Sequence, residues 1–234
     1  MKLTTPAAFV LIVALVAACS PPATEQSAAP SIAASIEPKK VDAPAGVYTL
    51  DKAHGSLVFR ISHMGYSNYT ARFTNFDVTM NFDPANPTAS TVSAKIDPNS
   101  LSADNAPKGF LDSLRGEEWL DTKKYPDVMF QSTAVTMTGA DTADVAGDFT
   151  LHGQTKPVTL HAKLNGGYPG MQFDPHARIG LSATARIKRS DFGISHAILP
   201  PNSNMGVSDE IDVVIETELS GPAWPGAPAS TTPH

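Results

Sequence analysis

The sequence predicts an all-β protein made of antiparallel strands. Apolar and polar residues alternate with a period of two in most apolar segments, which is typical of strands that bury one face. Short polar segments with glycine or proline separate them, as turns between neighbouring strands do. Only the segment 108–115 has the apolar i, i+4 spacing of a helix, through Phe110 and Leu114. These observations favour an antiparallel sheet structure with one short helix, which we expect to close one end.

The first long alternating stretch covers residues 57–82. One face of its first strand carries Leu57, Phe59, Ile61 and His63, so that a histidine ends a row of large apolar side chains. Phe73 then belongs to an odd-numbered apolar row, whereas from Phe76 onward the apolar residues are even-numbered. A change of register by one residue predicts a β-bulge near residues 74 and 75.

Further alternating segments follow along the chain. They cover 92–96, 128–137, 145–151, 158–164, 179–187 and 211–219, and a shorter segment covers 47–50. Turn sequences at 152–154 and 166–167 contain glycine. The whole pattern therefore predicts eight or nine antiparallel strands.

Strand length favours a closed barrel over a sandwich. The stretch 69–82 would span about 45 Å at roughly 3.3 Å per residue, whereas strands of globular domains have about 5 to 6 residues. A closed barrel removes the exposed edges. Small residues stand mid-strand on the faces expected to point inward, among them Ala94, Ala183 and Ala185. We predict a hollow apolar lumen for one slender hydrophobic ligand. The alternative is a solid barrel in which these small side chains oppose large ones.

Composition limits the class of protein. The chain has 234 residues, 41% hydrophobic and 17% charged, which suits one sizeable domain. Its formal net charge is -6 and no run of Lys or Arg exceeds two residues, so we expect no nucleic-acid partner. Cys19 is the single cysteine, which excludes an intramolecular disulfide and a CxxC metal site. Packing alone must stabilise the folded domain.

The N-terminus has the features of an export signal. Lys2 precedes an apolar segment, 7–16, that is too short to span a bilayer comfortably. Val16-Ala17-Ala18-Cys19 resembles the lipobox of bacterial lipoproteins, which predicts a signal peptide at 1–18 and an acylated Cys19 that binds the membrane surface. An ordinary secretory signal is the alternative. Ser20 after the cysteine favours the outer membrane, so we expect a periplasmic lipoprotein anchored there.

Two segments flank the expected domain. Residues 19–45 start at the cysteine and are rich in Ala, Pro and Ser, which predicts a disordered tether. Residues 221–234 contain four prolines and predict a disordered tail. The folded barrel is therefore expected at 46–220.

Several short motifs occur in order along this domain. They are Tyr48-Thr49-Leu50-Asp51, His54-Gly55-Ser56, Phe59, His63-Met64-Gly65, Phe73, Phe76, Tyr125-Pro126, Phe130-Gln131-Ser132-Thr133, Gly147-Asp148-Phe149-Thr150-Leu151-His152-Gly153 and Lys188-Arg189-Ser190-Asp191-Phe192-Gly193. In combination they resemble the YceI family, lipocalin-like periplasmic proteins that bind polyisoprenoids and related long-chain amphiphiles. The resemblance covers roughly 47–219. It implies an elongated eight-stranded antiparallel lipocalin-like barrel with the tail of the ligand in the lumen.

The inward-facing strand residues are the expected ligand contacts. They are Leu57, Phe59, Ile61, His63, Phe73, Phe76, Ala94, Phe149, Leu181, Ala183, Ala185 and Ile187. Apart from a bound isoprenoid or other long-chain lipid, no cofactor is expected. The resemblance implies a non-catalytic protein that binds, transports or sequesters such a lipid in the bacterial envelope. Protein partners are not indicated.

Polar residues at strand ends are candidates for contact with the head group of the ligand. His63 ends an apolar row, and Lys188 and Arg189 begin a corner segment where they can meet a phosphate or carboxylate. Structural alternatives stay open for both places. His63 can be a hydrogen-bonded wall residue, and the corner can be one in which Asp191 holds backbone amides while Phe192 plugs the barrel.

Motifs for catalysis or metal binding are missing from the sequence. There is no HExxH, HxxxH or GxSxG, and the Asp-Phe-Gly at 191–193 lacks the other kinase motifs. His54 stands in a turn-like His-Gly-Ser, where a turn role is expected. We therefore expect no metal and no enzyme. Two alternatives remain: a filled barrel that contacts other envelope proteins, and an enzyme that uses His63 as general base on a bound isoprenoid.

Overall fold

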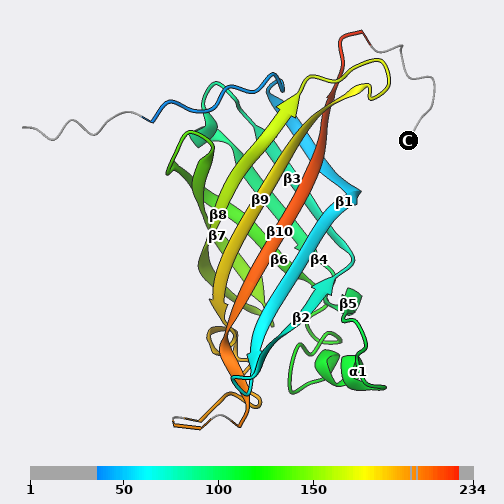
Figure 1. The fold of residues 1–234 in the computed structure, drawn as a ribbon, viewed down its shortest axis with the longest axis vertical. Helices are drawn as coiled ribbons and strands as arrows, with labels where there is room; N and C mark the ends of the chain where they lie inside the picture. The colour runs from blue at the N-terminus through cyan, green and yellow to red at the C-terminus, as the bar shows by residue number, and fades with distance from the viewer. Residues whose placement is uncertain (1–35, 201, 204, 227–234) are drawn as a thin grey trace, which may run out of the picture. The chain divides into compact units, whose positions relative to one another are not determined.

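An antiparallel sheet closes on itself to form a barrel of eight strands (Figure 1). The structure is a computed structural model, which describes residues 36–200, 202–203 and 205–226. It confirms the predicted all-β fold class. The predicted signal peptide 1–18, Cys19, the first part of the predicted tether and residues 227–234 lie outside the described residues.

Ten strand segments and one α-helix occur in the described residues. The strands are β1 (Gly46–His63), β2 (Ser67–Phe73), β3 (Phe76–Phe82), β4 (Thr91–Ile96), β5 (Leu101–Ser102), β6 (Val128–Met137), β7 (Thr142–Leu151), β8 (Gln154–Tyr168), β9 (His176–Lys188) and β10 (Val207–Ala223). The helix is α1 (Phe110–Arg115), and 3₁₀ turns lie at Pro87–Ala89, Pro98–Ser100 and Arg189–Phe192. They make eight barrel strands because β2 and β3 form one bent strand and β5 is a two-residue addition beside β2.

Strand β1 closes the barrel. Its first residues pair with β3, its last residues pair with β2, and its other edge pairs with β10. The predicted change of register falls where β2 ends and β3 begins, because Phe73 pairs with Leu57 on β1 whereas Phe76 pairs with Ile96 on β4. Both phenylalanines face the interior, as the change of parity requires.

One end of the barrel is covered by residues 36–45, which we call the strap, and this end is called the strap end. Ala43 of the strap is only 2% exposed, and the Lys39 N–H donates to the carbonyl of Ala140 at 2.6 Å. The described part of the predicted tether therefore packs on the barrel, which differs from the expected disorder. The described part of the predicted tail also differs, since β10 continues to Ala223 and the Trp224 N–H donates to the Pro175 carbonyl at 2.8 Å.

The opposite end carries α1 and is called the α1 end (Figure 1). Gly109 begins the helix in a left-handed conformation, with φ at 79°. Arg115 in the last turn donates from Nη2 to the Leu101 carbonyl at 2.6 Å and from Nε to the Asn99 carbonyl at 3.1 Å. These bonds attach the helix to the segment around β5. The predicted short helix at one end is thus confirmed, over 110–115 rather than 108–115.

Two buried clusters pack the barrel. The first contains Leu57, Phe76, Ile96, Val128, Leu151, Phe192 and Ile194, and the second contains Ala43, Tyr48, Phe82, Ala177, Ile179 and Leu219. The first includes the segment that follows β9 at the α1 end, and the second includes Ala43 of the strap. The apolar side chains of the strands are thus anchored at both ends of the barrel.

The close packing around Gly221 predicts that a methyl group added at this position lowers the stability of the protein. The Tyr48 ring lies where a side chain at 221 would begin, and the Tyr48 hydroxyl donates to the Pro44 carbonyl of the strap at 2.7 Å. The Tyr48 ring is fully buried. Burial also raises the pKa of Tyr48 to about 12. Gly221→Ala should lower the free energy of unfolding by about 1 to 3 kcal/mol. Urea denaturation of the wild type and the variant measures this difference in the free energy of unfolding.

Gly166 supplies the matched control. No atom lies within 4 Å of the position that a side chain at 166 would take, and its backbone is extended within β8. Gly166→Ala should leave the unfolding midpoint nearly unchanged. Equal midpoints for the two variants would show that the ring of Tyr48 moves aside.

Candidate ligand-binding site

The barrel is hollow. A cavity of about 560 Å³ reaches from the strap, at Pro38 and Lys39, to the α1 end, at Phe110 and Leu114. This volume lies within the range of roughly 300 to 1,000 Å³ that is usual for small-molecule sites. The alternative of a barrel filled solid by its own side chains is therefore wrong.

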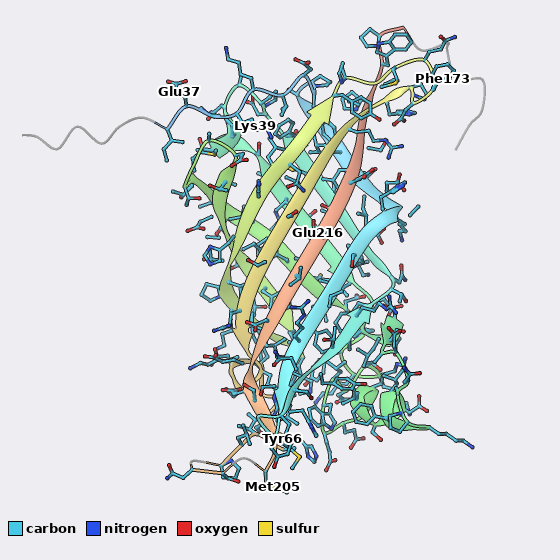
Figure 2. The ribbon with its side chains drawn as sticks, viewed as in Figure 1. Glu37, Lys39, Tyr66, Phe173, Met205 and Glu216 are labelled. Atoms are coloured by element: carbon cyan, nitrogen blue, oxygen red, sulfur yellow. The ribbon has the colours of Figure 1, made fainter. Side chains whose placement is uncertain are left out.

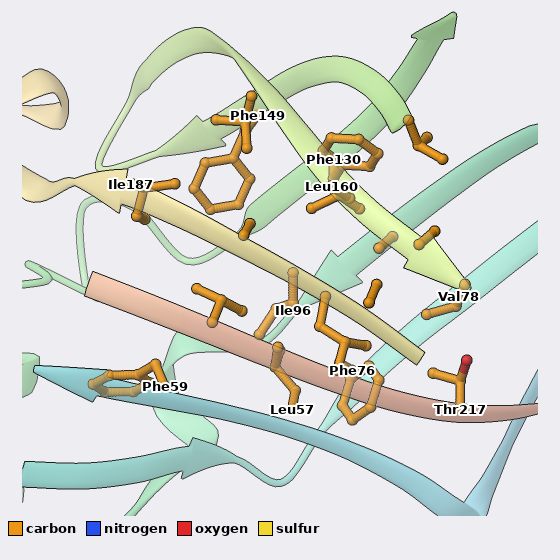
Figure 3. A pocket seen from close by; sticks show the side chains of 18 of the residues that line it. Leu57, Phe59, Phe76, Val78, Ile96, Phe130, Phe149, Leu160, Ile187 and Thr217 are labelled. Atoms are coloured by element: carbon orange, nitrogen blue, oxygen red, sulfur yellow. The ribbon is translucent and has the colours of Figure 1, made fainter. Parts of the chain in front are cut away.

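All twelve residues predicted to face the lumen line this cavity. They are Leu57, Phe59, Ile61, His63, Phe73, Phe76, Ala94, Phe149, Leu181, Ala183, Ala185 and Ile187. Figure 3 shows Leu57 and Phe59 of β1 and Phe149 of β7 projecting into it. The alanines leave space where larger side chains would close the passage. That these residues contact a ligand stays a prediction.

Other lining residues were missed by sequence reasoning. Val78 and Leu160 project into the cavity from β3 and β8 (Figure 3), and the alternation of their strands already placed them inward. Trp119 and Leu120 line the α1 end from the loop between α1 and β6. That loop has no strand periodicity, so only the folded structure brings these two side chains to the cavity.

Polar groups lie at the two ends of the cavity and are nearly absent between them. At the strap end the polar lining residues are Lys39, Ser90, Thr91, Asp141 and Thr142, and at the α1 end they are His63, Ser67, Tyr69 and Arg189. Between the ends Thr217 is the polar lining residue among those described, and its hydroxyl donates to the Leu181 carbonyl at 3.4 Å. A ligand that fits this distribution has an apolar chain and a polar group at one end.

Arg189 lines the α1 end, but its hydrogen bonds are made with the protein. The side chain is 1% exposed. It donates from Nε to Ser208 O at 2.9 Å, from Nη1 to His196 O at 2.6 Å and from Nη2 to Val207 O at 3.3 Å. Burial lowers the pKa of the guanidinium below its usual range. The predicted role of Arg189 as a head-group contact is thus replaced by a structural one, which is to hold the corner between β9 and β10.

Lys188 and Asp191 also differ from expectation. Lys188 follows the inward-facing Ile187, so its exposed side chain points out of the barrel and is not part of the cavity lining. Its predicted contact with a head group is therefore not supported by the lining of this cavity. The backbone-holding role expected of Asp191 belongs to Asp209, which accepts from the Ser190 N–H at 2.9 Å. Phe192 is buried at 1% exposure, as predicted.

The described histidines do not gather into a group that could hold a metal ion. His63 lines the cavity at its mouth with an exposed side chain. His54 lies at an irregular part of β1 rather than in a turn, and its Nδ1 is 3.0 Å from Asp51 Oδ2. Among residues 36–200, 202–203 and 205–226 no group of three or more His, Cys, Asp or Glu side chains is placed to hold a metal ion. None of the helices described there has the length and apolar character needed to cross a membrane.

Tyr69 is the polar residue that sequence reasoning overlooked. It lines the cavity, and its ring packs edge-on against Phe110 of α1 at 5.7 Å between centroids. The hydroxyl is buried and has no hydrogen-bond partner among the described residues. Burial raises the pKa of Tyr69. A buried hydroxyl without a partner costs about 1 to 3 kcal/mol, so a ligand atom that bonded it would be favoured.

An eight-stranded antiparallel barrel around an apolar cavity defines a lipocalin-like class of binding protein. Comparison with known protein families matches residues 48–219 to the YceI-like domain, and the chain belongs to the YceI family. It is 39% identical to protein YceI of Escherichia coli O157:H7 over 180 residues, which cover 75% of this chain and 87% of that protein.

Solved structures show the same fold. Burkholderia cenocepacia BcnA superimposes with a TM-score of 0.62 at 22% identity, covering 72% of this chain and 98% of that one. A polyisoprenoid binding domain from Saccharophagus degradans, implicated in plant cell wall breakdown, gives a TM-score of 0.52 at 18% identity, covering 75% and 98%. The predicted resemblance to the YceI family is therefore confirmed.

Proposed function

We propose that this protein binds a long-chain isoprenoid or similar amphiphilic lipid without catalysis, and transports or sequesters it in the bacterial cell envelope. The observation that carries the proposal is the cavity of about 560 Å³, whose wall is apolar between two polar ends. Such a cavity excludes water from an extended hydrocarbon chain and leaves a polar group at one end.

Burial of the chain supplies the driving force. Transfer of apolar surface out of water contributes about 25 cal/mol per Å², so a long hydrocarbon chain binds without a special chemical group. Several side chains of the cavity wall are placed to contact a hydrocarbon chain. They are the rings of Phe59, Phe73 and Phe149 and the alanines of β9. Lumen length and a few polar contacts then set selectivity.

Relatives support a lipid ligand. The chain shares the family of YceI proteins, and one neighbour of the same fold is described as a polyisoprenoid binding domain. Family and fold favour a binding protein over an enzyme. In addition, His63 lacks any partner among the described residues that would orient it as a base.

The envelope location rests on the N-terminal sequence. The signal-like segment 1–18 and the lipobox-like Val16-Ala17-Ala18-Cys19 favour export and acylation. An acyl chain contributes about 0.8 kcal/mol per buried CH₂ to membrane binding, and several chains together hold a protein at a membrane surface. Anchoring at the outer membrane is part of the same proposal.

Extraction of the purified protein tests the proposal. Denaturation in organic solvent followed by mass spectrometry should release an amphiphile in an amount close to one molecule per protein. A periplasmic protein that has no cavity is purified and extracted in parallel. It controls for lipid that adsorbs to the outer surface of a protein. Recovery of no amphiphile above this control would favour an interaction module that contacts other envelope proteins instead.

A further inference from the structure

We propose that the α1 end of the cavity holds the head of the lipid through Tyr69, and that it selects a neutral hydrogen-bonding head, such as an alcohol or a carbonyl, over a phosphate. This inference rests on the proposed lipid-binding function. It adds the orientation of the ligand and the chemical class of its head group.

The Tyr69 hydroxyl is a buried polar group of this end that has no hydrogen-bond partner among the described residues. Tyr69 pairs with Ile61 across β1 and β2, and both side chains line the cavity. The ring is held by the edge-on contact with Phe110. Its hydroxyl is buried without a partner, although every phenol can donate one hydrogen bond and accept others. The hydroxyl has almost no accessible surface, so an alcohol or carbonyl oxygen of the ligand can take that bond once a small rotation of the Tyr69 ring turns the hydroxyl toward the lumen.

Within the described part of the chain, this end has no lysine or arginine that is free to bind a phosphate. Arg189 is the only lysine or arginine among the described residues that line it, and each of its three nitrogens donates to a backbone carbonyl. A phosphate binds well where cationic side chains or several N–H groups point at it, and burying its charge without them is costly. Lys188 is exposed and points away from the cavity.

The remaining polar groups of the α1 end suit the same head. Ser67 supplies a second hydroxyl, and His63 stands at the mouth. Ser67 pairs with His63 across β1 and β2, two residues from Tyr69, so the three side chains lie on one side of the sheet. They form a short row of hydrogen-bonding groups that leads from the buried hydroxyl to solvent.

The strap end makes the opposite orientation a real competitor. Lys39 lies there, remote from Tyr66 at the α1 end (Figure 2). Its ammonium donates to the Asn165 carbonyl at 2.9 Å, and the carboxylate of Asp141 lines the same end of the cavity. An anionic head group would have to orient toward Lys39 and tolerate Asp141. Lys39 therefore gives the test its second variant.

Binding of matched lipids decides between the two orientations. The purified protein, freed of copurified lipid, is titrated with geranylgeraniol and with geranylgeranyl phosphate, with displacement of a fluorescent fatty probe as the readout. The wild type should bind the alcohol about tenfold more tightly than the phosphate. Tyr69→Phe should weaken the alcohol about tenfold and change the affinity for the fluorescent probe less than twofold.

Tyr66→Phe and Lys39→Met are the matched variants. Tyr66 is 81% exposed and lies outside the cavity lining, so Tyr66→Phe removes the same atom without effect on either lipid. Tighter binding of the phosphate, weakened in Lys39→Met and unaffected in Tyr69→Phe, would overturn the inference while the lipid-binding function stands. If neither lipid nor the probe binds, the proposed function fails with it.

Discussion

Replacing Ala183 by phenylalanine is expected to abolish lipid uptake while the barrel stays folded. Ala183 lines the cavity from β9, next to Ala162 on β8 and Ile215 on β10. A benzyl group at this place projects into the free space of the lumen and blocks the path of a hydrocarbon chain. We expect the lipid recovered by extraction to fall roughly tenfold or more, because the chain can no longer extend along the cavity.

Thr184→Phe is the matched control for this change. Thr184 is the next residue of β9 and is exposed on the outer face, so the same ring is added outside the barrel. Lipid uptake should then equal that of the wild type. Circular dichroism of both variants checks the fold. If Ala183→Phe and the parallel Ala185→Phe both take up lipid normally, the ligand binds outside the lumen.

Loss of Arg189 is expected to destabilise the barrel more than any other single charge removal discussed above. Arg189→Met keeps much of the volume of the side chain but removes the bonds donated to the carbonyls of Ser208, His196 and Val207, of which Val207 O keeps a bond from the Leu199 N–H. It also removes a guanidinium that lies 5.1 Å from the centroid of the Trp119 ring. Hydrogen bonds from charged groups contribute about 1.5 to 3 kcal/mol each, so we expect a loss of roughly 3 to 5 kcal/mol.

Urea denaturation of Arg189→Met and of its neighbour Lys188→Met measures this difference. Lys188 is exposed and makes no ion pair in the described structure, so its replacement should change stability by about 0.5 kcal/mol or less. Arg189→Lys separates charge from geometry. A lysine keeps the charge but cannot reach three separate carbonyls, and it should restore only part of the loss. Equal stability of the two methionine variants would refute the structural role of Arg189.

The faces of the strands were predictable because parity is a local property. Phe59 and Ile61 alternate with the polar Arg60 and Ser62, and a strand places every second side chain on the same side. The same rule applied to β9, where Ala183 and Ala185 face the lumen. Even the change of parity between Phe73 and Phe76 follows from the sequence alone, since both are apolar and both must be covered.

The polar groups of the site were less predictable, because their roles depend on distant partners. Arg189 has the chemistry of a phosphate-binding residue, but the fold places it among carbonyls of the chain that leads into β10. Tyr69 alternates correctly with Phe73, yet nothing in the sequence shows that its hydroxyl is left without a partner. Packing between elements far apart in the chain determines both results.

The irregular segments were the hardest to place. The Ala/Pro/Ser composition of 19–45 favours disorder, whereas Ala43 is buried against the barrel through its contacts with residues that follow much later in the chain. Trp119 reaches the cavity from a loop for the same reason. Composition describes the average behaviour of a segment, and a few buried contacts are enough to override it.

The pairing of β1 with β10 has a consequence for how a bound lipid would enter and leave. Because this seam completes the circle, a molecule inside would have hydrogen-bonded strands around most of the lumen. Parting two strands sideways would break many of these bonds at once. A bound lipid would therefore be expected to leave through the loops at the two ends of the barrel, where fewer main-chain hydrogen bonds must break.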